Sequence, residues 1–286
     1  MSSNILVAIK NISDLENNNL SDYFESYSAK IENVRQQIQY YLKDAISETS
    51  KSAKEKKPKD RYNRIFSYEG NKNSPPDLII KNGDAFIIRK NQTFKGSLNL
   101  GNSPPKDCLT WNDPWIIKNC RKVDGGQWDK KDIFYVAYMV ERSKIRYFYF
   151  VQGRCFIAEK EVYNQTIQNL KKIIKSYLKS KGLHTTLTSE LGKINKIDPL
   201  EVTTLRIRDV WKIQNPIKIF SDIYKYTKNQ EFTLTALMLK TKFESFPKKD
   251  IKNIMTDKLI NIKDEKIKDP NNPTEIIDVK LIKRSW

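Results

Sequence analysis

The chain has 286 residues, of which 38% are hydrophobic and 30% charged, and this composition is typical of a globular protein with a strongly polar surface. No apolar run approaches the roughly 20 residues of a membrane span. The N-terminus has no basic segment followed by a long apolar stretch, so we expect neither a membrane protein nor a secretory signal.

The charge indicates the class of partner. Lys and Arg total 52 against 34 Asp and Glu, which gives a formal net charge of +18. A surplus of this size bears on partners rather than on the fold. Phosphate backbones are the commonest polyanions that such a protein meets, because binding them releases condensed counterions. Nucleic acid is therefore the predicted partner, and general basic drift in a Lys-rich chain is the alternative.

The cysteines indicate the redox compartment. Cys108, Cys120 and Cys155 are odd in number and show no CxxC spacing. This pattern favours buried free thiols in a reducing, cytoplasmic compartment over a disulfide or zinc framework.

The first sixty residues predict helices and a basic loop. Residues 20–48 carry apolar side chains at helical spacing, which predicts one or two amphipathic helices. Residues 49–64 are basic and poor in apolar side chains, which predicts an exposed loop. This loop either lies along a phosphate backbone or is only a solvated linker.

A hairpin is predicted next. Two apolar runs in residues 77–90 flank Asn82-Gly83, a dipeptide suited to the positive φ angles of a tight turn. Residues 94–120 contain three prolines and several small polar residues, so we expect a loop there.

The rest of the chain predicts a sheet core. Residues 132–140 and 145–153 are rich in aromatic and β-branched side chains, which predicts two central strands joined by a polar turn. Residues 159–181 predict a long helix with lysines on its outer face. The last hundred residues predict short strands and loops.

These elements predict one mixed α/β domain over residues 1–286. Within it we expect N-terminal helices and the basic loop in 1–60, the hairpin and core strands in 61–160, and a helix with a C-terminal recognition region in 161–286.

The segment PPDLIIKNGDAFIIRK has part of the pattern of a metal-dependent phosphodiesterase. Such a site holds Mg²⁺ with carboxylates from neighbouring strands, and a lysine positions water or neutralises charge. Pro-Asp followed by acid-x-Lys places these groups on one face of a hairpin. Here Asp77 is present, but Ile87 stands at the acid position and Arg89 at the lysine position. A register shifted by one residue gives Ile88 and Lys90, which restores a lysine but no acid.

Several segments carry a resemblance to a known family. In order along the chain they are FSYEGNKNSPPDLIIKNGDAF, GSLNLGNSPPKDCL, DIFYVAYMV, ELGKINKIDPLEVTTLRIRDVWKIQNP and DPNNPTEIIDVKLIKRSW. They resemble type II restriction endonucleases of the NgoPII family, within the PD-(D/E)xK nuclease superfamily. The resemblance covers most of the chain and is looser in the N-terminal helices.

This resemblance implies a PD-(D/E)xK restriction endonuclease-like fold, with a mixed central sheet flanked by helices. It also implies a homodimer, Mg²⁺-dependent cleavage of double-stranded DNA at a short GC-rich palindrome, and a cognate DNA methyltransferase.

Carried over by residue, the family motif makes Asp77 a metal ligand. The family has Glu where this chain has Ile87 and Lys where it has Arg89, and acids where it has Gln39 and Tyr40. Isoleucine cannot bind Mg²⁺, and arginine, with a pKa above about 12, cannot act as a base. Arg89 can still stabilise developing charge as a fixed cation.

A relocated acid is one way to rescue this site. Glu69 is our first candidate, and with Asp77 and Arg89 it completes the predicted catalytic set. Asp84, Asp107 and Asp113 are the other nearby acids. Turn formation is the alternative role of Asp84, and a solvated loop that of Glu69. Three hypotheses follow: a restriction endonuclease that cuts, a related protein that binds DNA without cutting, or a basic RNA-binding or ribosome-associated protein. The ordered segments of the resemblance argue against the third.

The predicted DNA-contacting residues lie in two segments. The first, 90–106, combines donors, acceptors and cations suited to base edges and phosphates, with an ordinary polar loop as the alternative. In the second, Arg206 and Arg208 alternate with apolar residues and suit contact with guanine, although ion pairs to Asp209 or Glu201 would also satisfy them. The residues predicted in the first segment are Lys90, Gln92, Lys95, Ser97, Asn99, Asn102, Ser103 and Lys106.

Two other residues are expected to be structural. Trp211 is predicted to pack in the core rather than stack on a base. His184, the single histidine, has no partner at ligand spacing.

Overall fold

The structure is a computed structural model. It describes residues 3–14, 19–25, 33–47, 58–70, 75–126, 128–182, 190–195, 198–200, 202–225 and 230–285.

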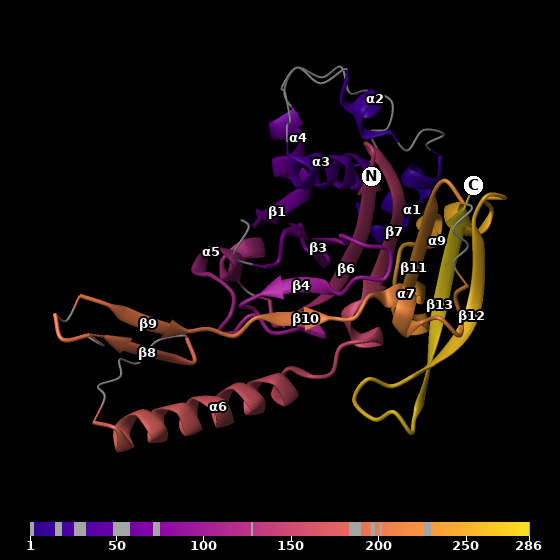
Figure 1. The fold of residues 1–286 in the computed structure, drawn as a ribbon. Helices are drawn as coiled ribbons and strands as arrows, with labels where there is room; N and C mark the ends of the chain where they lie inside the picture. Colours follow the sequence, from indigo (N-terminus) through magenta and orange to yellow (C-terminus); the bar gives the residue numbers. More distant parts are fainter. Residues whose placement is uncertain are drawn as a thin grey trace.

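A mixed sheet of nine strands forms the centre of the described part of the chain (Figure 1). Its strands are β1 (Phe66–Glu69), β2 (Leu78–Ile80), β3 (Ala85–Lys90), β5 (Cys108–Thr110), β6 (Lys130–Glu141), β7 (Lys144–Gln152), β11 (Thr233–Leu239), β12 (Asn261–Lys268) and β13 (Ile276–Ser285). The order is β1-β2-β3-β6-β7-β11-β13-β12, with β5 paired to β6. The β3–β6 and β7–β11 pairs are parallel and the others antiparallel.

The two central strands are confirmed where the sequence predicts them. Strands β6 and β7 form a hairpin whose two turn residues, Arg142 and Ser143, have φ angles of 48° and 62°. Positive φ at both central positions matches the twist of the flanking strands. The buried aromatic side chains of β6 and β7, among them Phe134, Tyr135 and Phe148, then fill the core on the two faces of the sheet.

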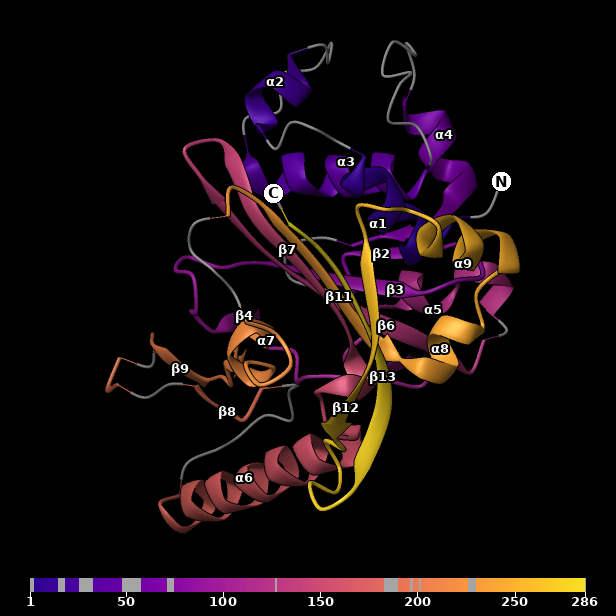
Figure 2. The same ribbon diagram turned by 90° about the vertical axis from the view of Figure 1, so that its right-hand side faces the viewer.

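Helices cover one face of the sheet (Figure 2). Asn4 begins the first of them, and its Oδ1 accepts from the backbone N–H of Leu6 at 2.9 Å and of Val7 at 3.1 Å. This first helix is apolar almost all round because it packs against the sheet and against two other helices. The helices are α1 (Ile5–Ser13), α2 (Leu20–Phe24), α3 (Val34–Ile46), α4 (Pro58–Ile65), α8 (Lys240–Glu244) and α9 (Lys248–Met255).

The other face of the sheet is covered by a small sheet and short helices. Strands β4 (Leu98–Gly101) and β10 (Trp211–Ile213) pair antiparallel beside the helices α5 (Lys118–Arg121) and α7 (Pro216–Ile219). Their apolar side chains join the second core cluster. Two 3-10 turns, η1 (Val123–Gly126) and η2 (Gly153–Cys155), complete this layer.

An arm extends beyond the end of the central sheet (Figures 1 and 2). It consists of α6 (Lys160–Ser180) and the antiparallel hairpin of β8 (Gly192–Asn195) and β9 (Thr204–Ile207). A Cβ at Gly192 would lie 3.0 Å from Cγ2 of Ile174, so the hairpin lies close against the helix. The predicted long helix is therefore confirmed, and its role as an arm is new.

Two predicted loops contain regular structure. The helix α4 begins at Pro58, a residue whose fixed φ suits the first helical position, so the loop prediction is wrong for its second half; residues 48–57 lie outside the described residues. Residues 94–120 contain β4, β5 and α5. The β4 strand pairs with β10, more than a hundred residues later, and such a distant partner is invisible to local pattern.

Other predictions have mixed outcomes. The N-terminal segment 20–48 contains two helices, as predicted, and the three cysteines are buried free thiols. Among the described residues, no helix is both long and apolar enough to cross a membrane. The mixed α/β fold with a large central sheet is confirmed, while the division of the chain into domains stays a prediction.

Candidate active site

The β2–β3 hairpin positions Asp77. The turn between the strands uses Asn82, whose φ of 55° confirms the predicted turn. The backbone N–H of Asp77 donates to the carbonyl of Phe86 at 2.8 Å, which extends the pairing by one residue beyond β2. Because Phe86 is also the register partner of Leu78, two successive residues of this strand face Phe86, as in a β-bulge.

The Asp77 carboxylate accepts hydrogen bonds from two arginines and one backbone amide. Arg89 Nη1 donates to Oδ2 at 2.6 Å, and the Ile88 N–H donates to the same oxygen at 2.8 Å. Arg35, from the first turn of α3, donates to Oδ1 through Nη2. Asp77 is 1% exposed. Both oxygens of a buried carboxylate are therefore engaged by cationic or N–H donors.

The acid position of the motif is apolar. Ile87 is 3% exposed and belongs to the second core cluster, together with Tyr68 and Ile79. On α3, Tyr40 contacts the ring of Tyr62, with ring centroids 5.9 Å apart. The neighbourhood of Asp77 therefore presents a hydrophobic wall and guanidiniums instead of a second carboxylate.

These residues do not fit a Mg²⁺ ion. Magnesium requires near-octahedral oxygen ligands, of which several are usually carboxylate or water oxygens. Asp77 offers one carboxylate, already bonded to Arg35 and Arg89, and Ile87 offers no oxygen. No group of three or more His, Cys, Asp or Glu side chains among the described residues could hold a metal.

Glu69, the first candidate for a relocated acid, is paired with a residue other than those around Asp77. It lies opposite Leu78 in the β1–β2 register. The Glu69 carboxylate is 2.6 Å from Lys43 Nζ. This ion pair joins β1 to α3, and the predicted catalytic role of Glu69 stays a prediction without a contact to support it.

The other three acids are also engaged elsewhere. Asp84 is 2.6 Å from Lys242 Nζ; burial raises the pKa of this carboxyl, and the lysine opposes the change. Asp107 accepts from the Sγ of the adjacent Cys108 at 3.4 Å. Asp113 forms a buried ion pair with Lys106, at 2.7 Å.

A cleft lies beside Asp77. It has a volume of about 440 Å³ and lies between the N-terminus of α3, the end of β3, and β4. Tyr138 in its wall is 1% exposed, and burial raises the pKa of its phenol to about 12, so it stays neutral. The residues lining the cleft are Asn33, Val34, Arg35, Ile88, Arg89, Lys90, Asn99, Leu100, Gly101 and Tyr138.

The first predicted DNA-contacting segment borders this cleft. In β4 the side chains alternate, so Leu98 and Leu100 are buried and Asn99 is exposed. Ser103 and Lys106 are buried, and burial lowers the pKa of Lys106 while Asp113 opposes the change. The exposed members are Lys90, Gln92, Lys95, Ser97, Asn99 and Asn102. Their contact with DNA stays a prediction, and Lys106 has the surroundings of a structural ion pair.

The two arginines of the second segment lie on the arm and share one acid. Arg206 Nε is 2.9 Å from Glu190 Oε2, and Arg208 Nε is 2.6 Å from Glu190 Oε1. The hydrogen bond from Arg206 lowers the pKa of Glu190. Asp209, a predicted partner, instead accepts from Trp211 Nε1 at 2.5 Å. Trp211 packs edge-on against Tyr163, and both are partly buried against the second core cluster, as predicted for Trp211. Glu201 and His184 lie outside the described residues.

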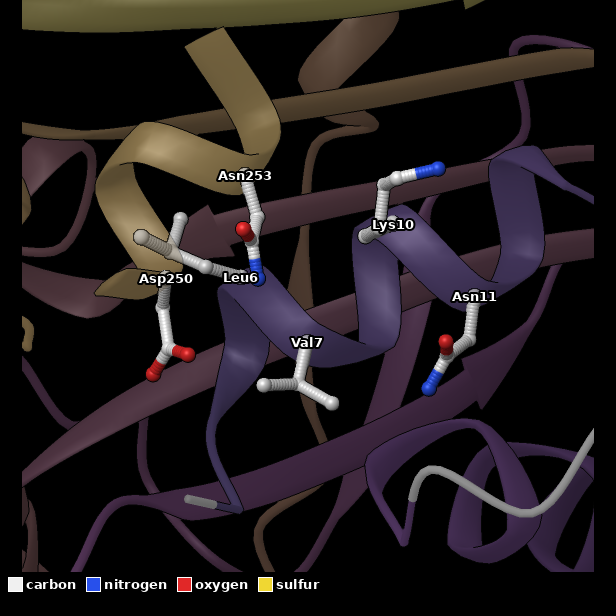
Figure 3. Close-up of a pocket in the computed structure, with 6 residues that line it drawn as sticks. All are labelled: Leu6, Val7, Lys10, Asn11, Asp250 and Asn253. Atoms are coloured by element: carbon white, nitrogen blue, oxygen red, sulfur yellow. The ribbon is translucent and has the colours of Figure 1, made fainter. Parts of the chain in front are cut away.

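A second pocket, between α1 and α9, offers no comparable chemistry (Figure 3). It has a volume of about 260 Å³. Its Asp250 accepts from Asn4 at 2.7 Å, and its Lys10 pairs with Asp257 at 3.0 Å. The charged groups of this pocket therefore hold helices together.

The comparisons with known proteins identify the family of this chain. Residues 3–268 match the sequence model of the NgoPII restriction endonuclease family. The chain is also 34% identical over 283 residues to Type II restriction enzyme NgoPII of Neisseria gonorrhoeae, a match that covers 98% of each chain. The chain belongs to the NgoPII restriction endonuclease family. No solved structure matches it significantly.

As a member of the NgoPII restriction endonuclease family, the chain belongs to a group whose name implies sequence-specific cleavage of DNA. Its hairpin begins with Pro76-Asp77, and Arg35 and Arg89 contact that aspartate. Sequence reasoning missed Arg35. The only signal in the chain is its place one helical turn before Gln39, where the resemblance leads us to expect an acid.

Proposed function

We propose that this protein binds double-stranded DNA in a sequence-specific manner and does not hydrolyse it by Mg²⁺ chemistry at Asp77. The observation that carries the proposal is the pairing of the Asp77 carboxylate with both Arg35 and Arg89, while Ile87, at the expected acid position, is buried. A site with this charge attracts phosphate and repels a divalent cation.

The net charge of +18 and the cleft support DNA as the ligand. Arg35, Arg89 and Lys90 bring three cations to one cleft wall, and Asn99 adds an amide that can donate or accept. Cations position a protein on the phosphate backbone, while amides suit base edges. The exposed residues of 90–102 extend this polar surface from the cleft.

The second candidate function is Mg²⁺-dependent cleavage of a short GC-rich palindrome. Membership of a restriction endonuclease family and the retained Asp77 favour it. In that case a DNA methyltransferase would have to protect the host's own target sites, and the protein would act in the cytoplasm, where the DNA lies.

One experiment separates the two functions. Unmethylated plasmid DNA is incubated with the protein in EDTA, Ca²⁺, Mg²⁺ or Mn²⁺, and cleavage and gel retardation are both recorded. We expect retarded, intact DNA in every condition and an affinity that falls steeply with salt, because several phosphates are contacted. Cleavage that needs Mg²⁺ or Mn²⁺ and is abolished by Asp77→Asn would establish the second function. An affinity independent of salt would exclude DNA binding.

We further propose that the protein acts as a homodimer. A palindromic duplex has two-fold symmetry, which a symmetric dimer matches. The arm carries a suitable surface, a stripe on α6 that contains Val162, Leu170, Ile173 and Tyr177, between 43% and 65% exposed. The stripe contains no lysine, so its chemistry suits a second apolar surface rather than a phosphate backbone.

A further inference from the structure

We infer that Arg35, Asp77 and Arg89 form a binding site for a DNA phosphate group that works without a divalent metal. We call these three residues the arginine clamp. The inference rests on the proposed DNA binding for the source of the phosphate, and on the clamp itself for the chemistry.

The charge balance of the clamp favours an anion. Two guanidiniums surround one carboxylate, so the group keeps one positive charge after internal pairing. Lys90, next to Arg89 on the cleft wall, is exposed and has no hydrogen bond or ion pair within the described residues. A phosphodiester in the cleft would therefore meet a surplus of cationic charge.

The clamp also retains donors for a ligand. A guanidinium carries five N–H groups in a planar fork. Arg35 contacts Asp77 through Nη2, and Arg89 contacts Asp77 and the Ile88 carbonyl through Nη1. The side chains of Arg35 and Arg89 are 27% and 14% exposed, so other donors of each fork can reach a molecule in the cleft.

Asp77 has the role of a positioning residue in this arrangement. Its Oδ2 accepts from the Ile88 N–H at 2.8 Å, which fixes the carboxylate to β3. The carboxylate then holds two long side chains from different elements, α3 and β3, on one wall of the cleft. Holding them before the ligand arrives reduces the conformational entropy that binding would otherwise remove.

The beginning of α3 reinforces the preference for an anion. Asn33 caps this helix of thirteen residues, and its Oδ1 accepts from the backbone N–H of Arg35 at 2.8 Å. Asn33 and Val34 line the same cleft as Arg35. The positive end of the helix dipole therefore faces the cleft and adds to the charge of the arginines.

The test compares neutral variants of the clamp with a neutral variant elsewhere. Binding of a short fluorescent duplex is measured in EDTA over a range of salt concentrations for the wild type, Arg35→Gln, Arg89→Gln and Lys249→Gln. Lys249 is an exposed lysine of α9 that does not line the cleft, and its replacement by Gln removes the same single charge as each clamp variant. In the same buffer, inorganic phosphate is added and the melting temperature is followed.

We expect the wild type to bind DNA in EDTA. Each clamp variant should lose about one unit of the slope of log K against log salt, because one phosphate contact is lost, while Lys249→Gln keeps the wild-type slope. Phosphate should raise the melting temperature of the wild type and of Lys249→Gln but not of the clamp variants. If Arg89→Gln does not fold, Asp77→Asn with Arg89→Gln removes both charges together and takes its place.

Two results would overturn the inference. One is a Ca²⁺-induced gain in DNA affinity that Asp77→Asn abolishes, because it would assign Asp77 to a metal. The other is clamp variants with the slope and phosphate response of Lys249→Gln. Failure of the proposed function has a different signature: no DNA binding at any salt concentration, with a phosphate response that still depends on Arg35 and Arg89.

Discussion

Rebuilding the family motif should create a Mg²⁺-dependent nuclease. The change is Ile87→Glu with Arg89→Lys, which restores the acid and the lysine that the resemblance implies. Arg35 must be replaced as well, since it occupies Oδ1 of Asp77 in the structure. We therefore expect the double variant to cut weakly and the triple variant, which adds Arg35→Gln, to cut faster.

The magnitudes explain this order. One preorganised group that stabilises transition-state charge is worth on the order of 10² to 10³ in rate, so two restored groups supply roughly 10⁴ to 10⁶. A unit-charge pair 4 Å apart is worth about 4 kcal/mol at an effective dielectric constant of about 20, so a guanidinium at that distance opposes a divalent ion by roughly 8 kcal/mol. Retaining Arg35 can thus cancel much of the gain from the other two changes.

The same variants lose stability. Ile87 is 3% exposed, and the loss of one buried aliphatic side chain costs about 1.5 to 3 kcal/mol before the cost of burying a carboxylate. Urea unfolding should therefore show a lower midpoint for the double and triple variants. Cleavage is then compared at a temperature at which all variants are folded.

The assay is nicking of supercoiled plasmid with Mg²⁺ and with EDTA. Ile87→Gln with Arg89→Lys and Arg35→Gln is the matched control, because it has a similar shape without the new carboxylate, and it should stay inactive. Asp77→Asn in the triple variant should abolish cleavage. The reasoning is refuted if the triple variant is folded, binds DNA and still does not cut. It is also refuted if the wild type already cuts and Asp77→Asn leaves its rate unchanged.

Three further predictions concern other parts of the molecule. Asp113→Ala should lower the free energy of unfolding, measured in urea, by about 3 to 5 kcal/mol, because Lys106 stays buried without its partner. The apolar pair Asp113→Leu with Lys106→Met should lower it much less. Equal losses in the two variants would contradict this prediction. Glu190→Gln should steepen the salt dependence of DNA binding by up to about two units, because it releases two arginines, and an unchanged slope would remove the arm from the DNA interface. Ile173→Lys should shift the sedimentation coefficient from that of a dimer to that of a monomer, because it places a charge in the apolar stripe of α6. Gln168→Lys, on the lysine-bearing side of α6, should leave it unchanged. A wild type that sediments as a monomer would refute the proposed dimer interface.

Local sequence pattern was enough to predict the elements whose own composition or periodicity identifies them. The β6–β7 strands and α6 carry enough aromatic, β-branched or periodic apolar residues to be recognised without knowledge of their partners. The same holds for the β2–β3 turn at Asn82. In contrast, β4 has only four residues and becomes a strand because β10 pairs with it. Such short strands depend on tertiary contacts that local sequence does not contain.

The candidate site likewise has one part that the sequence predicts and another that it does not. The closeness of Arg89 to Asp77 could be predicted, because both lie on the β2–β3 hairpin whose turn the sequence indicates. The contribution of Arg35 could not, because it lies 42 residues before Asp77 and depends on how α3 packs on the sheet. The burial of Lys106 could not be predicted either, because a lysine in a polar segment is usually exposed and here an ion pair with Asp113 compensates its burial.

The charges of Arg35, Asp77 and Arg89 balance as those of the motif that the resemblance implies would. Without an acid at position 87, a buried Asp77 needs a different set of partners, and Arg35 and Arg89 supply them. An aspartate, a glutamate, a lysine and one Mg²⁺ ion together carry a single positive charge, and so do Asp77, Arg35 and Arg89. The cleft can thus attract a phosphate as the metal-loaded site that the resemblance implies would, without the ion that would activate water there. DNA affinity in EDTA should therefore equal that in Ca²⁺, because the charge that Ca²⁺ would bring is already built into the chain.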